Sequence, residues 1–326
     1  MRRQAVKRIH LWAAVCAALS VAPAWAQSSY PNKPIRLVIG YTPGGAADVI
    51  ARIVGDAMSR QLGQPINVDN KPGAGSTLGS DILARAPADG YTLGLATATL
   101  YGIDQHLYKA KYTPADFTPI TRFTISPLVL AVSKNTGVKN VQELVAYAKA
   151  NPGKLNYASS GIGGSPHIAG LSFEKAVGTK MTHIPFKGGA PALQSVASGD
   201  VHLSFGTASS VLPLGQQGLV RMLGVTTAQR SAIAPELPTV ADSGLPGFEF
   251  TFWFGLFGPA NLPKDVSDKL FAAATKVLAD PEVKAKLLAG GNDALPSRSP
   301  AEFHEWAGAN GRAVLERVEQ AGVKLE

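Results

Sequence analysis

The stretch IRLVIGYTPGGAADVIAR, Ile35–Arg52, decides the fold of this chain. Its first residues, up to Ile39, are mostly apolar and rich in branched side chains, which predicts a short β-strand. Gly44 and Gly45 then permit a turn that other residues resist, and apolar residues recur at helical spacing from Val49 onward. The predicted helix begins with backbone amides that have no intrahelical partner, which favours an anion site. Many α/β proteins use such a turn only as a connection, so its recurrence along the chain is what favours binding.

The first 26 residues have the pattern of a secretory signal peptide. Four basic residues between Arg2 and Arg8 precede the apolar run Leu11–Val21, which is too short to anchor the chain in a membrane. Ala24-Trp25-Ala26 has the small-x-small form of a cleavage site, so we expect an exported, periplasmic chain that begins at Gln27. The single cysteine, Cys16, leaves with the leader, and the mature chain then needs no disulfide. The pair Arg2-Arg3 leaves the twin-arginine export route open.

Charge and length limit the function and the domain organisation. Removing the leader, which has four basic and no acidic residues, lowers the formal net charge from +8 to +4. That charge is small for 300 residues, and no basic cluster is interleaved with aromatic residues, so a nucleic-acid partner is not indicated. Three hundred residues exceed the usual single core, which predicts two domains.

Strand-like and helical segments alternate along the chain, which indicates α/β domains with largely parallel sheets covered on both faces. Tyr112–Thr124, with two prolines, is expected to be irregular, and Ser231–Leu245 to be a surface loop. The alternating phenylalanines of Phe248–Phe254 predict an aromatic strand face, interpreted as core or inter-domain packing, with ligand stacking as the alternative. The other expected strands are Pro65–Val68, Tyr91–Ala96, Pro127–Ser133, Lys154–Ala158, Thr182–Phe186, Val201–Phe205 and Val220–Thr226.

Several helix starts have clear capping signals. Asn140 and Ser299 each precede a glutamate three residues on, the form of a capping box. Ser165 is expected to be an N-cap followed by a proline at the first helical position. Asp280-Pro281 is a similar start, and Lys264–Ala279 is an amphipathic helix.

Sequence motifs for catalysis, metal binding or cofactor binding are missing. Histidines show no HxxxH or HExxH pair, and no GxSxG or Walker motif is present. Gly73–Gly79 gives GxGxxxG, one residue off the dinucleotide fingerprint. His183 and His202 are expected to be structural, whereas His167 follows a Ser-Gly loop and is a candidate ligand contact. Asp48 is explained by capping and an i,i+4 pair. Glycine loops without a nucleophile, base or metal favour a receptor without a cofactor over an enzyme.

The segments PIRLVIGYTPGGAADVIAR, VDNKPGAGSTLGSDILARAPADGYTLGLAT, YASSGIGGSPHIAG, HIPFKGGAPAL and PTVADSGLPGFEF resemble the Bug-type solute receptors of tripartite tricarboxylate transporters. The resemblance covers essentially the whole mature chain. It implies a two-lobed periplasmic-binding-protein type II (Venus flytrap) fold with a largely parallel sheet in each lobe. Residues 27–125 and 251–326 are expected to form lobe 1, and 126–250 lobe 2. The implied function is to bind a carboxylate-bearing solute between the lobes and deliver it, as a monomer, to a membrane permease.

Such receptors hold the ligand carboxylate through loop amides, small hydroxyl residues and bridging water. One departure is Gly206, where many family members have an aspartate. Carried over by position, the implied ligand contacts are Tyr41, Thr42, Gly44, Gly45, Thr97, Ser160, Gly161, Gly163, Ser165, Lys187, Gly188, Gly189, Gly206 and Thr207, beside His167 from the loop argument.

Two other functions stay open from the sequence. One is a periplasmic hydrolase that uses Ser160 or Ser165 with His167, and the other is a sensory receptor that signals to a kinase. Within the candidate loops Lys187 is the only cation and no arginine is available for a bidentate carboxylate clamp. A ligand ammonium group would find no carboxylate partner, because Gly206 stands where many family members have an aspartate and capping already explains Asp48. We therefore expect the ligand to be a mono- or dicarboxylic acid without an amine, such as an aromatic or hydroxylated one, bound chiefly through one carboxylate.

Overall fold

The computed structural model describes residues Tyr30–Val323. The chain divides into two units, Met1–Asn32 and Lys33–Glu326, and the fold below is that of the second. The expected signal peptide lies outside the described residues. Across Tyr30–Val323, no helix combines the length and apolar character needed to cross a membrane.

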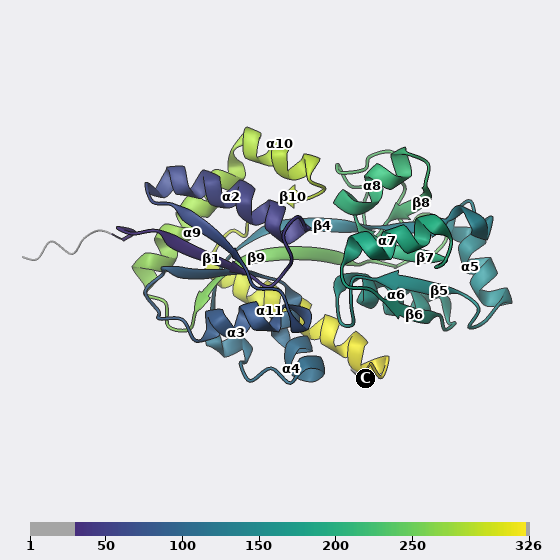
Figure 1. Cartoon of the computed structure of the whole chain (residues 1–326), viewed down its shortest axis with the longest axis horizontal. Helices are drawn as coiled ribbons and strands as arrows, with labels where there is room; N and C mark the ends of the chain where they lie inside the picture. The colour runs from purple at the N-terminus through teal and green to yellow at the C-terminus, as the bar shows by residue number, and fades with distance from the viewer. Residues whose placement is uncertain (1–29, 324–326) are drawn as a thin grey trace, which may run out of the picture. The chain divides into compact units, whose positions relative to one another are not determined.

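Strands and helices alternate along most of this unit (Figure 1). The strands are β1 Ile35–Ile39, β2 Ile66–Asn70, β3 Thr92–Ala96, β4 Phe117–Ser133, β5 Asn156–Ser159, β6 Thr182–Pro185, β7 Leu203–Thr207, β8 Val220–Val225, β9 Thr251–Pro259 and β10 Asp293–Ala294. The α-helices are α2 Ala46–Leu62, α3 Thr77–Ala84, α4 Ile103–Tyr108, α5 Val141–Ala150, α6 Ser165–Val177, α7 Gly189–Ser198, α8 Ala208–Gln216, α9 Lys264–Ala279, α10 Pro281–Ala289 and α11 Pro300–Gln320. Short 3₁₀ turns include η1 Ala74–Ser76 and η2 Ala98–Tyr101.

The sheet has two halves joined by β4 and β9. Its order is β2-β1-β3-β9-β4-β7-β5-β6, with β8 and β10 also beside β4. In the first half β1 is parallel to β2 and β3, and in the second half β5 is parallel to β6 and β7. The long strand β4 pairs with β9 through Phe117–Pro127 and with β7 through Leu128–Val132. The expected α/β fold with largely parallel flanks is confirmed, and the antiparallel strands β4 and β9 run between the halves (Figure 1).

The expectation that Tyr112–Thr124 is irregular is wrong from Phe117 onward. Pro119 lies inside β4, where the register against β9 shifts between Pro119 and Thr121. A bulge lets a strand include a residue that cannot donate to the ladder. Both faces of the strand are covered, since Ile120 and Thr121 are each fully buried. Burial on both faces removes the alternation by which a strand is recognised in a sequence.

The aromatic strand begins at Thr251, three residues later than predicted. Phe248 precedes it and packs against Phe173 and Phe205 in the core of the second half, with ring centroids 6.1 Å away in each case. Phe254 is 2% exposed in the first half. The interpretation of these rings as core packing is confirmed for Phe248 and Phe254.

The N-caps predicted at Asn140 and Ser299 are confirmed, and the one predicted at Ser165 is wrong. Asn140 Oδ1 accepts from the Glu143 amide at 2.8 Å, while the Glu143 carboxylate accepts from the Lys139 amide at 2.7 Å. The glutamate therefore reaches one residue further back than in a standard capping box. In α6 the N-cap is Gly164, so Ser165 is the first helical residue rather than the cap. Helix α8 follows β7 directly and was not predicted.

The GxGxxxG segment has a packing role. A β-carbon on Gly79 would lie 2.8 Å from the Cα of Gly40, and one on Gly75 would lie 2.4 Å from the Tyr108 ring. These glycines therefore let α3 and η1 pack against the loop after β1 and against α4. This close packing accounts for the motif without a dinucleotide.

Candidate functional site

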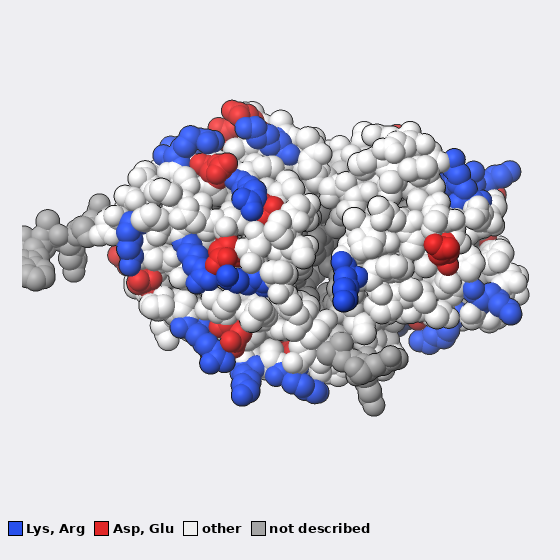
Figure 2. All heavy atoms as spheres, viewed as in Figure 1, with Lys and Arg blue, Asp and Glu red and all other residues white. Residues whose placement is uncertain are grey.

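Loops from both halves meet beside the two connecting strands. Figure 2 shows a groove between the halves of the described molecule. The Tyr41 ring packs edge-on against Phe254, which packs against Phe252, at centroid distances of 5.8 and 4.7 Å. Phe252 lines a narrow cavity together with Thr97 of the first half and Ser165 of the second. The structure thus brings predicted residues of both halves together at β9.

Asp48 organises the loop between β1 and α2. Its carboxylate accepts from the Gly44 amide at 3.0 Å, the Asn70 amide group at 3.1 Å and the Arg52 guanidinium at 2.9 Å. Asn70 also donates to the Tyr41 carbonyl at 3.1 Å. Burial alone would raise the pKa of Asp48, but hydrogen bonds from Arg52, Gly44 and Asn70 bring it below its usual value. The expected capping role and i,i+4 pair are confirmed.

This arrangement changes the anion site expected at Gly44. The Gly44 amide already has an acceptor, and the ionised Asp48 carboxylate offsets the positive end of the α2 dipole. Gly44 itself is exposed with φ +81°, and a β-carbon there would meet no protein atom within 4 Å. Gly45 is half-buried and Thr42 is exposed beside it. The loop therefore offers an open glycine surface, but a weaker anion site than the sequence predicts.

Two stacked histidines hold the loop after β5. The His167 and His183 rings are 3.8 Å apart and 11° from parallel. His167 Nδ1 accepts from the Gly163 amide at 3.0 Å, and His183 Nε2 lies 2.7 Å from the Ser159 hydroxyl oxygen. Burial lowers the pKa of His167 to about 3 and that of His183 to about 4, so both rings are neutral near pH 7. His167 is 3% exposed and supports the loop from behind, whereas the sequence indicated a ligand contact.

A serine hydrolase arrangement is not assembled here. Within residues 30–323, neither Ser160 nor Ser165 has a hydrogen bond to a histidine; the one serine–histidine contact there joins Ser159 to His183. Ser159 is fully buried and also accepts from the Gly161 amide at 3.1 Å. The described residues contain no group of three metal-ligating side chains.

Gly163 is a point of contact between the halves. Its φ is +75°, and a β-carbon there would lie 2.5 Å from Leu107 Cδ1 and 3.3 Å from Ile103 Cγ2, both on α4. Next to it, the Tyr108 hydroxyl donates to the Ile162 carbonyl at 2.7 Å. Gly163 therefore permits close approach of α4, rather than the approach to ligand that the sequence suggested. Sequence reasoning missed the Tyr108 contact, because nothing local pairs residues 54 positions apart.

The two remaining loops of the second half contain the starts of α7 and α8. Lys187 is exposed and has no hydrogen-bond or ion-pair partner within the described chain. Gly189 is the first residue of α7, and a β-carbon on it would lie 3.8 Å from the Ser210 hydroxyl in α8. Thr207 is the N-cap of α8, with its hydroxyl 2.9 Å from that of Ser210. These two helix starts therefore lie side by side.

Gly206 lies in a strand, whereas the sequence predicted that it lies in a loop. It lies inside β7, is buried, and a β-carbon there would lie 2.5 Å from Val211 Cγ2. A side chain at this position would enter the core beneath α7 and α8. The position therefore does not support a direct ligand contact from Gly206.

The turn that follows helix α10, residues 290–292, contacts elements of both halves. A β-carbon on Gly291 would lie 2.5 Å from the Ser209 amide nitrogen of α8, and one on Gly290 would lie 3.3 Å from Val49 in α2. Asn292 accepts from the Ser126 hydroxyl of β4 at 2.9 Å. The turn after α10 thus bridges the starts of α2 and α8.

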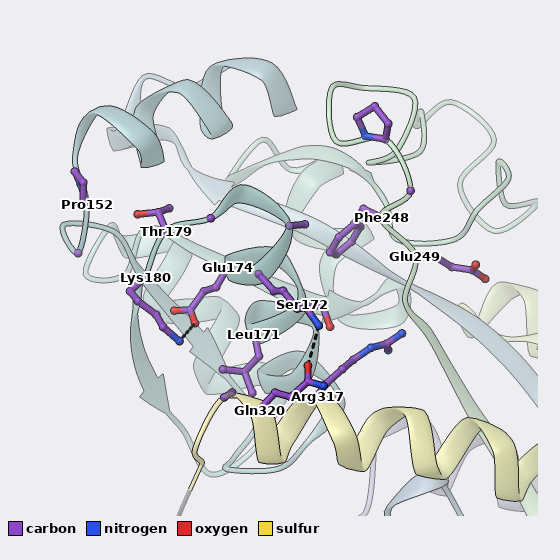
Figure 3. Close-up of a pocket in the computed structure, with 17 residues that line it drawn as sticks. Pro152, Leu171, Ser172, Glu174, Thr179, Lys180, Phe248, Glu249, Arg317 and Gln320 are labelled. Carbon is purple, nitrogen blue, oxygen red and sulfur yellow. Dashed lines mark hydrogen bonds and ion pairs between the residues drawn. The ribbon is translucent and has the colours of Figure 1, made fainter.

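A larger cavity lies elsewhere, between α6, the end of α11 and residues 246–249 (Figure 3). Its volume is about 990 Å³. The charged side chains in it are partly paired, since Lys180 lies 3.4 Å from Glu174 and Lys175 donates to Gln320 at 2.8 Å. None of the predicted site residues lines it. We therefore place the candidate site in the groove and not in this cavity.

Two α/β halves joined by two antiparallel strands, with a groove between them, form the fold of a periplasmic binding protein. A model of the tripartite tricarboxylate transporter family receptor matches residues 50–301, and the chain belongs to this family. The receptors of this family bind substrates for transport.

Individual relatives agree with this assignment. The chain is 29% identical over 319 residues to the protein BugT of Bordetella pertussis, covering 91% of this chain and 92% of the relative. An R. palustris protein solved with adipate has a TM-score of 0.84 and 31% identity, covering 91% of this chain and 100% of the other. MatC from Rhodopseudomonas palustris, solved with bound malate, has a TM-score of 0.79 and 29% identity, covering 89% and 100%.

Proposed function

We propose that this receptor binds a small organic acid in the groove between its halves, through at least one carboxylate, and delivers it to the membrane permease of a tripartite tricarboxylate-type transporter. The observation that carries this proposal is the set of helix starts of the second half. The first turns of α6, α7 and α8 contain no acidic residue, unlike that of α2. Pro166 in α6 and Pro191 in α7 have no N–H, but the other first amides of these three helices have no intrahelical acceptor, and Lys187 lies on the loop before α7. Adipate and malate in two similar structures support an acid as the ligand.

The free energy available from these groups is sufficient for binding. A hydrogen bond to a charged group contributes roughly 1.5–3 kcal/mol. Each helix dipole adds about 0.3–1 kcal/mol, and more when partly buried. Micromolar binding requires about 8 kcal/mol. Four or five such interactions reach this value without an arginine.

The proposed contacts come from both halves. Tyr41, Thr42, Gly44, Gly45 and Thr97 would face the ligand from the first half. Ser160, Gly161, Ser165, Lys187, Gly188, Gly189 and Thr207 would face it from the second half. We also propose that residues 27–125 and 251–326 move as one lobe and 126–250 as the other.

A thermal-shift screen of organic acids tests this function. We expect malate, adipate, succinate or benzoate to raise the melting temperature by several degrees, because ligand at 100 times its Kd adds roughly 2.7 kcal/mol. The matched control is the corresponding diamide, such as succinamide, which keeps the shape and lacks the charge. Equal shifts for acid and amide, or no shift from any acid, would contradict carboxylate binding.

We propose export with cleavage after Ala26, as the sequence predicts. The intact mass of protein from the periplasmic fraction should correspond to a chain that begins at Gln27. A chain that retains Met1, or that starts at a lipid-modified Cys16, would refute this cleavage. We also propose that the receptor acts as a monomer and supplies a permease rather than a sensor kinase. The match to the receptor family of tripartite tricarboxylate transporters supports the permease.

A further inference from the structure

Asp104 is a buried carboxyl group in the first turn of α4, and it has no cationic partner among residues 30–323. It is fully buried in α4, and its Oδ2 accepts from the Tyr112 hydroxyl at 2.7 Å. Its Oδ1 is buried without a hydrogen-bond partner in the described part of the chain. Besides Tyr112, the Thr99 hydroxyl lowers the pKa of this carboxyl group. No lysine or arginine within residues 30–323 forms an ion pair with it. A buried carboxylate without a cation is costly, which suggests a role outside stability.

The position of Asp104 links it to the groove. The preceding residue, Ile103, and the hydroxyl residue Thr99 line the narrow cavity between the halves. One turn later, Tyr108 donates to the Ile162 carbonyl of the second half. The charge of Asp104 also acts on the hydroxyl of Tyr41 in the first candidate loop. Asp104 therefore lies next to two residues that line the narrow cavity between the halves.

We propose that Asp104 sets the charge selectivity of the groove by taking up a proton when an anionic ligand binds. This inference rests on the proposed carboxylate-binding function. An anion in the groove and an ionised Asp104 repel each other, so the bound state favours the neutral acid. By linkage, the form of the receptor with a protonated Asp104 binds the anion more tightly.

Among the tyrosines and stacked histidines around it, Asp104 is the group whose protonation state changes near pH 6. Burial raises the pKa of Asp104 to about 6, against the opposing effect of the Tyr112 and Thr99 hydroxyls. The facing tyrosines, Tyr41, Tyr108 and Tyr112, have pKa values raised by burial and stay neutral. From the second half His167 and His183 are neutral above pH 5. On the outer side of α4, His106 lies 3.8 Å from Glu319 of α11 and needs its own control.

The affinity for the anion is therefore expected to rise as the pH falls from 8 to 6. At pH 8 Asp104 is ionised and the anion must bind against its charge. At pH 6 about half of the molecules already hold the proton. If the anion raises the pKa of Asp104 by one unit, affinity increases about fivefold from pH 8 to pH 6, since one unit corresponds to a tenfold change in the binding constant.

The test is calorimetric titration of malate and adipate between pH 6 and pH 8, where these acids stay largely ionised. We expect affinity to rise about fivefold toward pH 6 in the wild type, with proton uptake seen as a dependence of the heat on buffer ionisation. Asp104→Asn, which mimics the neutral acid, should bind with pH-independent affinity at least equal to that of the wild type at pH 6. Asp56→Asn at an exposed position and His106→Gln should both keep the wild-type pH dependence.

Several results would overturn the proposal. Affinity that is independent of pH in the wild type, without proton uptake, would refute it and leave carboxylate binding intact. A rise of affinity with pH would show Asp104 acting as a counter-ion to a cationic group. Loss of binding by Asp104→Asn at every pH would show a merely structural carboxylate. If neither acid binds at any pH, the proposed function fails and this inference fails with it.

Discussion

Gly163→Val should weaken ligand binding by about 10- to 100-fold while the protein stays folded. The added β-carbon would lie 2.5 Å from Leu107 Cδ1, so the loop before α6 could no longer approach α4. Overpacking of this kind costs about 1–3 kcal/mol. It destabilises the conformation in which the two halves are in contact. Isothermal titration with the best acid from the screen measures the loss, and circular dichroism shows whether the fold is kept.

Matched variants separate this contact from other causes. Gly137→Val places the same side chain at an exposed glycine with φ +72° and no neighbour within 4 Å, so it controls for backbone strain and should bind normally. Leu107→Ala should partly restore binding to Gly163→Val, because it removes the clashing group. Gly44→Val is expected to abolish binding by obstructing the ligand itself, and Leu107→Ala should not rescue it. Rescue of both variants, or of neither, would contradict the assignment of Gly163 to the contact between the halves.

Aspartate should bind at least about 100-fold more weakly than malate, which has a hydroxyl group where aspartate has its ammonium group. An ammonium group buried without a carboxylate partner costs several kcal/mol. Asp48 is already engaged by Arg52 and the Gly44 amide, and Asp104 is fully buried. Competition titration of the two acids against a bound carboxylate measures the ratio. Succinate should bind comparably to malate and serves as the control for size.

A second pair, benzoate and 4-aminomethylbenzoate, repeats the comparison on an aromatic frame. If either amine-bearing compound binds more tightly than its partner, the argument from missing carboxylates is wrong. Asp48→Asn and Asp104→Asn would then identify the counter-ion, because only one of them should remove the preference.

Local patterns were sufficient to predict much of the fold. The strand Ile35–Ile39 and the helix Lys264–Ala279 have the predicted bounds, because each depends on periodicity within a few residues. The caps at Asn140, Asp280 and Ser299 form as expected, since a capping side chain and its amide lie within three residues. The strand β4 was partly missed because its bulge at Pro119 is stabilised by pairing with a strand far along the chain.

The candidate site was predicted less completely, because its contacts are long-range. The sequence indicates glycine loops, but it does not show that the Gly44 amide is used by Asp48. Nor does it show that Gly163 faces Leu107, or that His167 stacks on His183. Asp104 looks like any acidic residue at a helix start, and only the tertiary structure shows that it is fully buried.

The most direct test of this account is a crystal structure of the receptor with the tightest-binding organic acid from the screen. The account predicts a ligand carboxylate in the groove, within hydrogen-bond distance of the first amides of α6, α7 or α8. Tyr41 or Thr97 should complete the contacts from the first half. An acid bound instead in the cavity between α6 and α11, beside Arg317, would contradict the account.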